Sequence, residues 1–399
     1  MCQKRGLRQG DPLSPLLYVL SFEPLLKKLN SSLRGIRLEK GHLKTKAFAD
    51  DTVIAVNNQD WSTLKRLLIT YQFISNAKIN ETKSKLLFLS SPSQRILQSA
   101  LPFTPIEENE RITFLGLPII NRTFSSTILW KEITSLMKNK FESLSQRNLS
   151  IRGRVLATKS LVYSKAWYYT VVLPPNFKTK KTISSITSQF IRNSSLLPAY
   201  QKLSLPLTKG GIAAPDWQLS INSILTKQCI TLFTSKSLWA TNARSLLEKN
   251  LKSRSSRKLD LFQALENINS TLGWPRKWIP WIAAWRKSGG SFQDSFTSPY
   301  ICKSDLYINN INATVFTVRK GIKILQKPTR QHSLNEKLWF LLWKLPLDNK
   351  KKEIVWKFLS NAFASGERLK RFNPISCPFC NLQDFNRTHF LATCPSRTK

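Results

Sequence analysis

Two adjacent carboxylates, Asp50 and Asp51, stand between the apolar runs KAFA and TVIAV in the stretch KTKAFADDTVIAV, residues 44–56. Short runs of this kind on either side of polar residues predict two strands joined by a tight turn. The aspartates then lie at or beside the tip of a hairpin. Because the strands fix their position and the turn leaves them exposed, they are candidate ligands for cations.

The pair has two interpretations. Polymerases use carboxylates to hold two divalent cations, of which one activates a 3′-hydroxyl and the other stabilises the leaving pyrophosphate. Asp-Asp is also ordinary turn chemistry in hairpins. The pair by itself leaves both interpretations open.

The segments around the hairpin predict an α/β layer. Residues 12–29 carry leucines near helical spacing, and Pro24 is expected to kink or end that helix. A second amphipathic helix is expected to run from an N-cap at Ser62 to about residue 80, with further strands at 85–90 and 112–120. This order of strand, helix and strand indicates an α/β layer.

The rest of the chain reads differently. After about residue 125 the pattern is helical. Gly289 and Gly290 predict a loop or linker, and ATVFTV at 313–318 gives a weak strand signal. A length of 399 residues predicts two or three domains. The expected fold class is therefore α+β.

The chain is strongly basic, with 62 Lys and Arg residues against 23 Asp and Glu and a formal net charge of +39. This balance indicates a polyanionic partner, with nucleic acid first and an anionic membrane surface second. Residues 143–259 hold nineteen basic side chains and only two acidic ones. Aromatic residues such as Trp167 are interleaved with this charge, as base stacking requires. Packing in a core is the alternative for each aromatic side chain.

No apolar run reaches 18 residues, so a membrane span is not expected. The N-terminus MCQKRGLRQGDP lacks the apolar stretch of a signal peptide. Six cysteines are too few and too scattered for a disulfide framework, which indicates a reducing, intracellular compartment.

Three of the six cysteines and one of the three histidines fall within CPFCNLQDFNRTHFLATC, residues 377–394. They are spaced C-x2-C-x8-H-x4-C and comprise Cys377, Cys380, His389 and Cys394. Three thiolates and an imidazole are a closed tetrahedral set typical of structural Zn²⁺, and the C-x2-C spacing lets two sulfurs converge on one ion. Unliganded buried thiols are the alternative.

Four stretches of the N-terminal part resemble, in their order and spacing, the palm motifs of reverse transcriptases from non-LTR (LINE-type) retrotransposons. They are GLRQGDPLSPLLY at 6–18, FADD at 48–51, INETKSKLLFL at 79–89 and FLGLPI at 114–119. The resemblance continues to the Cys/His cluster through LSIRGRVLATKSLVYSKAWYY at 149–169, LTKGGIAAPDW at 207–217 and WKFLSNAFASGERLKRF at 356–372. It covers most of the chain, and residues 220–340 are the least distinctive part.

The resemblance implies that Asp50 and Asp51 are the catalytic pair and bind Mg²⁺. Phe48 and Ala49 complete the family's aromatic-x-Asp-Asp box, beside the nucleotide and template. The Cys/His cluster matches the family's C-terminal zinc-binding segment, whose expected task is to hold template RNA or target DNA.

Other positions match family motifs as well. Gln9 and Gly10 match the segment that lies against the template and the nascent base pair, where a glycine permits close backbone approach. Lys83 matches a basic position near the incoming triphosphate, and an ordinary surface lysine is the alternative. Leu115 and Gly116 match the turn that grips the primer end.

One departure from the family pattern concerns the first metal-binding aspartate. In the family it lies on an earlier palm strand, upstream of the glycine-glutamine motif, together with the fingers. This sequence begins five residues before Gly6, so we expect both to be missing, along with the endonuclease domain that often precedes the polymerase. A fragment that polymerises weakly or not at all is therefore expected.

The expected architecture has four parts. They are a partial reverse-transcriptase palm at 1–122, a helical thumb-like basic region at 123–220, a connecting region at 221–335 and a zinc-binding domain at 336–399. The expected function is that of an RNA-directed DNA polymerase fragment acting on an RNA template and a DNA primer or target. The alternative is a non-catalytic RNA- or DNA-binding protein that uses the basic helical middle and the zinc module. The resemblance also implies a nuclear location, and it leaves the oligomeric state open.

Overall fold

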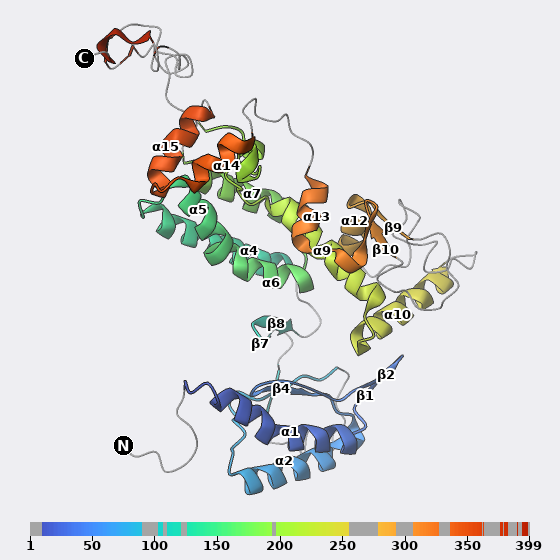
Figure 1. Cartoon of the computed structure of the whole chain (residues 1–399). Coiled ribbons are helices and arrows are strands. Elements are labelled where there is room, and N and C mark those ends of the chain that lie inside the picture. Colours follow the sequence, from blue (N-terminus) through green and yellow to red (C-terminus); the bar gives the residue numbers. More distant parts are fainter. Residues whose placement is uncertain are drawn as a thin grey trace, which may run out of the picture. The chain divides into compact units, whose positions relative to one another are not determined.

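The computed structural model describes residues 10–89, 103–106, 110–120, 126–193, 197–254, 278–292, 306–326, 336–360, 362, 376–377, 379–381, 389 and 393–397. The chain divides into two compact units. The first comprises Met1–Ser125 and Ser235–Leu261, and the second comprises Ser126–Thr234 and Phe262–Lys399. Figure 1 labels their helices and strands.

The first unit combines helices with short strand pairs. Its helices are α1 (Ser14–Ser32), the 3-10 turn η1 (Asn58–Asp60), α2 (Trp61–Ser75) and α10 (Leu238–Arg254). Its antiparallel pairs are β1 (Ile36–Leu38) with β2 (Gly41–Leu43), β3 (Thr45–Phe48) with β4 (Asp51–Ile54), and β7 (Arg111–Phe114) with β8 (Leu117–Ile120). One pair is parallel, β5 (Lys85–Leu86) with β6 (Thr104–Pro105). This mixture of helices and strands confirms the α+β prediction.

The core of the first unit lies where α1 packs against α2 and β3 (Figure 1). Both helices bury apolar side chains at three- and four-residue spacing, which places them on one face of each helix. These side chains are Leu25, Leu29 and Leu33 at the end of α1, and Trp61, Leu64 and Leu68 on α2. Pro24 lies inside α1 and does not end it, and the buried side chains beyond the proline anchor the second half of the helix.

A buried carboxylate fixes the start of α2. Asp60 is 3% exposed and accepts hydrogen bonds from the backbone N–H groups of Arg34 (2.8 Å) and Gly35 (2.7 Å). It also closes a capping box with Asn57, whose side chain accepts from the Asp60 N–H at 3.0 Å. The connection after α1 is thereby tied to the connection that precedes α2.

The expected ends of α2 are wrong. The helix begins at Trp61, one residue before the expected N-cap at Ser62, because Asn57 and Asp60 already cap the preceding turn. It stops at Ser75, since Asn76 adopts a left-handed conformation with a φ of 56°. Apolar residues continue past Ser75 in the sequence, but the helical conformation of the backbone ends there.

Two expected strands are also corrected. Residues 112–120 form no single strand but the hairpin β7–β8, since Leu115 and Gly116 adopt positive φ angles of 49° and 76° and reverse the chain. The strand expected at 85–90 shortens to the two residues of β5.

The second unit is mainly helical, which confirms the change of pattern expected after residue 125. Its first helices are α4 (Ser126–Ser145), α5 (Ile151–Ala157), the π-helical turn η2 (Thr158–Val162), α6 (Tyr163–Val172), α7 (Phe177–Arg192), α8 (Tyr200–Leu203), η3 (Leu207–Lys209) and α9 (Trp217–Thr234). The later helices are α12 (Ile279–Lys287), η5 (Ala313–Val315), α13 (Val318–Leu325), α14 (Glu336–Lys344), α15 (Asn349–Leu359) and η7 (Pro395–Arg397). One small antiparallel sheet has the order β11 (Ile311–Asn312), β10 (Leu306–Ile308), β9 (Gly290–Phe292).

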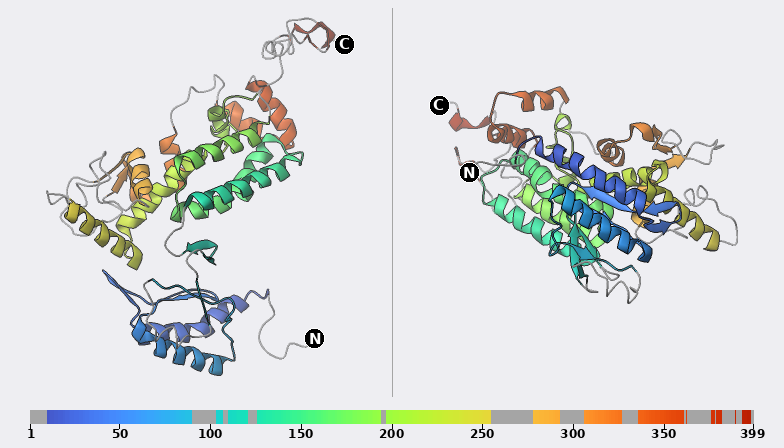
Figure 2. Two further views of the ribbon diagram at one scale, coloured as in Figure 1. Left: turned by 180° about the vertical axis from the view of Figure 1, so that it is seen from behind. Right: turned by 90° about the horizontal axis from the view of Figure 1, so that it is seen from below.

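Aromatic side chains fill the core between the long helices of this unit, which lie side by side in Figures 1 and 2. Trp217 is 1% exposed and stacks on Trp167, with ring centroids 4.4 Å apart. Tyr163 packs edge-on against both rings and donates its hydroxyl hydrogen bond to Thr187 at 2.7 Å. Trp167 therefore packs in the core, which was the alternative to a role in base stacking.

Two further expectations in the second unit are wrong. The segment ATVFTV forms the 3-10 turn η5 and then the N-cap of α13, because Asn312 and Thr317 side chains cap the two turns. The loop or linker expected at Gly289 and Gly290 is wrong in part: Gly289 lies in the turn after α12, but Gly290 begins β9 and lies so close to the Trp285 ring that no Cβ would fit. Among the described helices, none combines the length and apolar character that a membrane crossing requires.

We expect Asp60→Ala to lower the free energy of unfolding of the first unit by about 3 kcal/mol, because buried backbone N–H groups lose a charged acceptor. Urea denaturation of the purified chain measures this change. The matched control is Glu23→Ala, which removes an accessible carboxylate 4.0 Å from the Lys27 ammonium group. It should lower the free energy of unfolding by less than about 0.5 kcal/mol. Equal effects of the two substitutions would contradict the structural role of Asp60.

Candidate functional site

The hairpin β3–β4 carries the two candidate carboxylates at its tip. Phe48 pairs with Asp51 across the strands, so Ala49 and Asp50 alone form the turn. Ala49 has a φ of 53°, a left-handed conformation of the kind that two-residue hairpin turns use. Asp50 and Asp51 are both exposed. The hairpin and its tip are thus as predicted.

Neither carboxylate is used by the fold. Within the part of the chain that the structure describes, Asp50 and Asp51 have no hydrogen-bond or ion-pair partner. Carboxylate oxygens without protein partners are the ligands that Mg²⁺ prefers. The same described residues contain one cluster of three or more metal-ligating side chains, and the hairpin is not part of it. The hairpin therefore offers a divalent cation two carboxylates and no third one.

Tyr18 on α1 is a neighbour of this tip that the sequence did not reveal. Burial raises the pKa of its hydroxyl, and the nearby Tyr71 and Asp50 raise the pKa further. Tyr18 also stacks on Phe22, with ring centroids 5.7 Å apart. The four-residue spacing of these aromatic residues on a predicted helix was the available signal, but it does not show which element the pair faces.

The remaining predicted positions of the first unit lie on turns and strand ends. Phe48 is 67% exposed beside the carboxylates. Gly10 has a φ of 97°, and Gln9 lies outside the described residues. Lys83 is exposed in a turn, where its backbone N–H donates to Asn80 Oδ1 at 3.0 Å.

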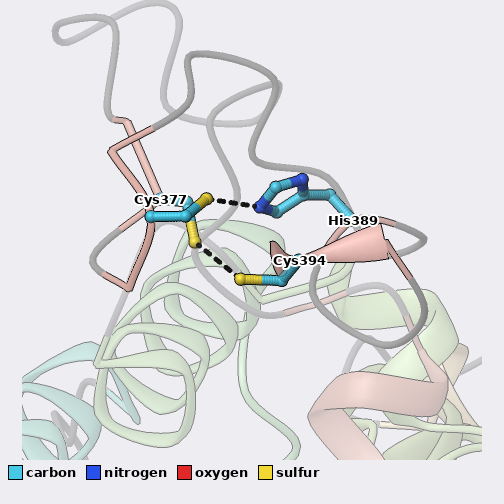
Figure 3. A group of neighbouring side chains, drawn as sticks. Cys377, His389 and Cys394 are labelled. Atoms are coloured by element: carbon cyan, nitrogen blue, oxygen red, sulfur yellow. Dashed lines mark hydrogen bonds between the residues drawn. The ribbon is translucent and has the colours of Figure 1, made fainter. Parts of the chain in front are cut away.

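The second candidate site is the cluster of Cys377, Cys380, His389 and Cys394. The four ligand atoms all lie within 4.8 Å of one another. Figure 3 shows the labelled side chains turned toward a common centre. Cys377 Sγ is 3.8 Å from Cys394 Sγ, and Cys380 Sγ is 3.1 Å from His389 Nε2. The structure thus brings together all four residues that the spacing predicted.

The cluster fits a tetrahedral metal ion. Zn–S bonds of about 2.3 Å place two ligating sulfurs about 3.8 Å apart, and Cys377 and Cys394 have this separation. Burial raises the pKa of Cys377, but hydrogen bonds from the backbone of Phe379 and Cys380 and from the side chains of His389 and Cys380 outweigh it and bring the pKa to about 6. A thiol with a low pKa is readily present as the thiolate, which is the form that binds metal.

Comparison with known proteins identifies a family for the N-terminal part of the chain. Residues 1–119 match the family model described as reverse transcriptase (RNA-dependent DNA polymerase). The matched segment contains the β3–β4 hairpin and the β7–β8 turn. The Cys/His cluster lies outside it.

Two curated proteins are similar to about half of the chain. The transposon TX1 uncharacterized 149 kDa protein of Xenopus laevis is 30% identical over 214 residues, which are 52% of this chain and 16% of that protein. The retrovirus-related Pol polyprotein from type-2 retrotransposable element R2DM of Drosophila melanogaster is 25% identical over 218 residues, which are 51% of this chain and 19% of that protein. The match therefore spans less than a fifth of either relative.

We expect Ala49→Gly to raise the free energy of unfolding by about 0.5–1 kcal/mol, since glycine adopts a positive φ without the steric cost that alanine meets there. Ala47→Gly is the matched control in the neighbouring strand and should lower it by about the same amount. Urea denaturation of both variants measures the two effects. A loss of stability in both would show that the turn does not have the described conformation.

Proposed function

We propose that the chain, whose residues 1–119 match the reverse-transcriptase family, is part of the RNA-directed DNA polymerase of a non-LTR retrotransposon. We assign the catalytic metal ligands to Asp50 and Asp51. The observation that carries this proposal is the turn itself. It presents two adjacent exposed carboxylates, without protein partners among the described residues, inside the segment that matches the family.

The proposed chemistry needs ligands for Mg²⁺ and surfaces for the template, the primer and the incoming nucleotide. When bound, Mg²⁺ activates a 3′-hydroxyl and stabilises a leaving pyrophosphate. Asp50 and Asp51 hold the ion, because the strand pair fixes their backbone while the exposed turn leaves their oxygens open. The exposed Phe48 ring and Ala49 lie beside the nucleotide and template.

The other assigned positions lie before and after the hairpin in the sequence. Gln9 and Gly10 contact the template and the nascent base pair, and Lys83 contacts the incoming triphosphate. The turn of Leu115 and Gly116 grips the primer end, and its two positive φ angles give it a tight, defined shape.

The proposed metal site is incomplete within the described residues. Two adjacent carboxylates repel each other, and two cations held about 3.5–4 Å apart require more ligands than the pair provides. We therefore propose that residues 1–399 polymerise weakly or not at all by themselves.

We further propose that the four predicted parts keep their roles: palm at 1–122, thumb at 123–220, connecting region at 221–335 and zinc-binding domain at 336–399. The partners are then an RNA template and a DNA primer or target, and the place of action is the nucleus. The charge of the 143–259 segment supports a polyanionic partner, since nineteen basic residues stand against two acidic ones.

A second candidate function is non-catalytic binding of RNA or DNA by the basic helical middle and the zinc module. The observation that favours it is a set of cations on α5 and η2 of the second unit, Arg152, Arg154 and Lys159, whose pKa values burial lowers. Both candidate functions require nucleic-acid binding, and only the first requires Asp50 and Asp51.

We propose that the Cys/His cluster holds a structural Zn²⁺ ion. Four ligands complete a tetrahedral shell and leave no open position for a reacting group. Cys377 is fully buried, and His389 and Cys394 are each 6% exposed. A site closed in this way stabilises its own segment, and it does not perform chemistry.

Primer extension on an RNA template with Mg²⁺ tests catalysis. We expect no more product from the purified chain than from the double variant Asp50→Ala, Asp51→Ala, because the described residues offer two of the required ligands. Template-dependent synthesis that the double variant abolishes would contradict the incompleteness and would confirm the catalytic pair.

Cleavage by bound Fe²⁺ tests the same pair without requiring activity. Iron with peroxide should cut the backbone next to residues 50 and 51, and excess Mg²⁺ should suppress the cut by competing for the ligands. The control Asp348→Ala removes an exposed acid of the second unit and should leave the cut unchanged. Cleavage that persists in the Asp50→Ala, Asp51→Ala variant would exclude the pair as metal ligands.

Metal analysis tests the Cys/His cluster. We expect one equivalent of zinc per chain. Cys380→Ser or His389→Ala should weaken the affinity for zinc at least about tenfold, since each removes one of four ligands. Cys229→Ala is the control, because Cys229 is buried in α9 and belongs to no cluster of metal ligands in the described residues. Unchanged zinc content in both ligand variants would show that the thiols are not liganded.

A further inference from the structure

Two cations of the second unit bind consecutive carbonyl groups of one loop. Arg152 of α5 donates from Nη1 to the Ile212 carbonyl at 2.9 Å. Lys159, about two turns further in the π-helical segment η2, donates from Nζ to the Ala213 carbonyl at 2.7 Å. The guanidinium and the ammonium group therefore lie side by side.

The loop that holds these cations is fixed by its own backbone. The Ile212 N–H donates to the Leu203 carbonyl at 3.1 Å, and the Ala213 N–H donates to the Leu205 carbonyl at 2.9 Å. Gly211 approaches the Leu205 carbonyl so closely that a Cβ would lie 2.0 Å from its oxygen. Ala213 is held at a φ of 54°. The two carbonyl groups are thus rigid supports for the cations.

Arg319 adds a third positive charge from another element. It is exposed on α13, a helix capped by Thr317 and packed through Gly321 against Ser223. Burial lowers the pKa of Lys159, and the charges of Arg152 and Arg319 lower it further. Arg152 of α5 and Arg319 of α13 therefore both lie within electrostatic reach of Lys159 on η2.

No acidic side chain balances these charges among the residues that the structure describes. Arg152, Lys159 and Arg319 form no ion pair there. Arg154, on the same helix as Arg152, differs: burial lowers its pKa, and the nearby carboxylate of Glu353 partly offsets this. One carbonyl contact uses one of five N–H donors of a guanidinium or one of three of an ammonium group. N–H donors and positive charge therefore remain uncompensated. A bound anion would supply acceptors for the donors and a negative charge for the cations.

We propose that Arg152, Lys159 and Arg319 together bind one backbone phosphate of a nucleic-acid strand. This inference rests on the proposed function, which requires nucleic-acid binding, and it names the contact point within the second unit. A guanidinium binds phosphate oxygens with a planar fork, and a lysine adds a point charge. The π-helical turn that carries Lys159 is a distortion that occurs frequently at functional sites.

The alternative is that Arg152 and Lys159 serve only to hold the loop. Arg319 separates the two accounts, because it has no hydrogen bond in the described structure and is not needed for the loop. Arg319→Gln removes its charge, and Lys320→Gln removes an equal charge from the next exposed residue of α13. Lys320 is not among the groups that act on Lys159.

The experiment measures binding of a single-stranded RNA to the full chain over a range of salt concentrations. Loss of one phosphate contact lowers the slope of log K against log salt by about 0.7 for single strands. We expect this change and an affinity loss of about fivefold for Arg319→Gln, and less than about twofold for Lys320→Gln.

Three results would overturn the inference. Equal effects of the two substitutions would reduce the cluster to general surface charge, although wild-type binding would still support the proposed function. Absence of RNA binding by the wild type at low salt would refute the proposed function and the cluster with it. Displacement of RNA by inorganic phosphate from wild type but not from Arg319→Gln, at matched ionic strength, would assign the cluster to a free anion.

Discussion

The first unit depends on one buried carboxylate. Asp60 accepts backbone hydrogen bonds from the connection after α1 and belongs to the capping box that starts α2. The β3–β4 hairpin lies in the sequence between these two connections, so its position follows from theirs. Gly35, one of the two donors from the first connection, has a φ of 72° and no room for a Cβ next to the Leu43 carbonyl. The place of the candidate carboxylates is therefore set by residues that take no part in their chemistry.

Acidic residues of this basic chain have two different environments. Asp60 is buried, and backbone dipoles replace the water that its charge requires. Asp50 and Asp51 are exposed and have no partner in the described residues, so the fold gains nothing visible from them. In a chain with a formal net charge of +39, two unpaired carboxylates at one turn are a local exception. This contrast supports a ligand role for the pair, because acids that serve the fold have partners within it.

The sequence predicted features whose signals are local. The hairpin and the Cys/His cluster follow from runs and spacings within a few residues of one another, and both are present. The end of α2 and the break in the strand expected at 112–120 gave no signal in the apolar pattern, because non-glycine residues such as Asn76 and Leu115 adopt positive φ there. The turn at Leu115 and Gly116 was expected only from the family resemblance. Proximity between distant segments, such as the electrostatic effect of Asp50 on Tyr18, has no sequence signal at all. The four-part domain division and the roles of the site residues remain predictions.

The two candidate metal sites differ in how far apart their ligands lie in the sequence. The four ligands of the Cys/His cluster lie within eighteen residues, so one short segment can bring a complete shell together. The carboxylate pair is only the local part of the proposed Mg²⁺ site, whose remaining ligands would come from segments distant in the sequence. A pair held on a rigid turn keeps its geometry without those ligands, but two like charges bind a cation more weakly than a full shell does. Local order therefore preserves the form of the proposed metal-binding hairpin, while the completeness of its ligand shell depends on residues that distant segments bring to it.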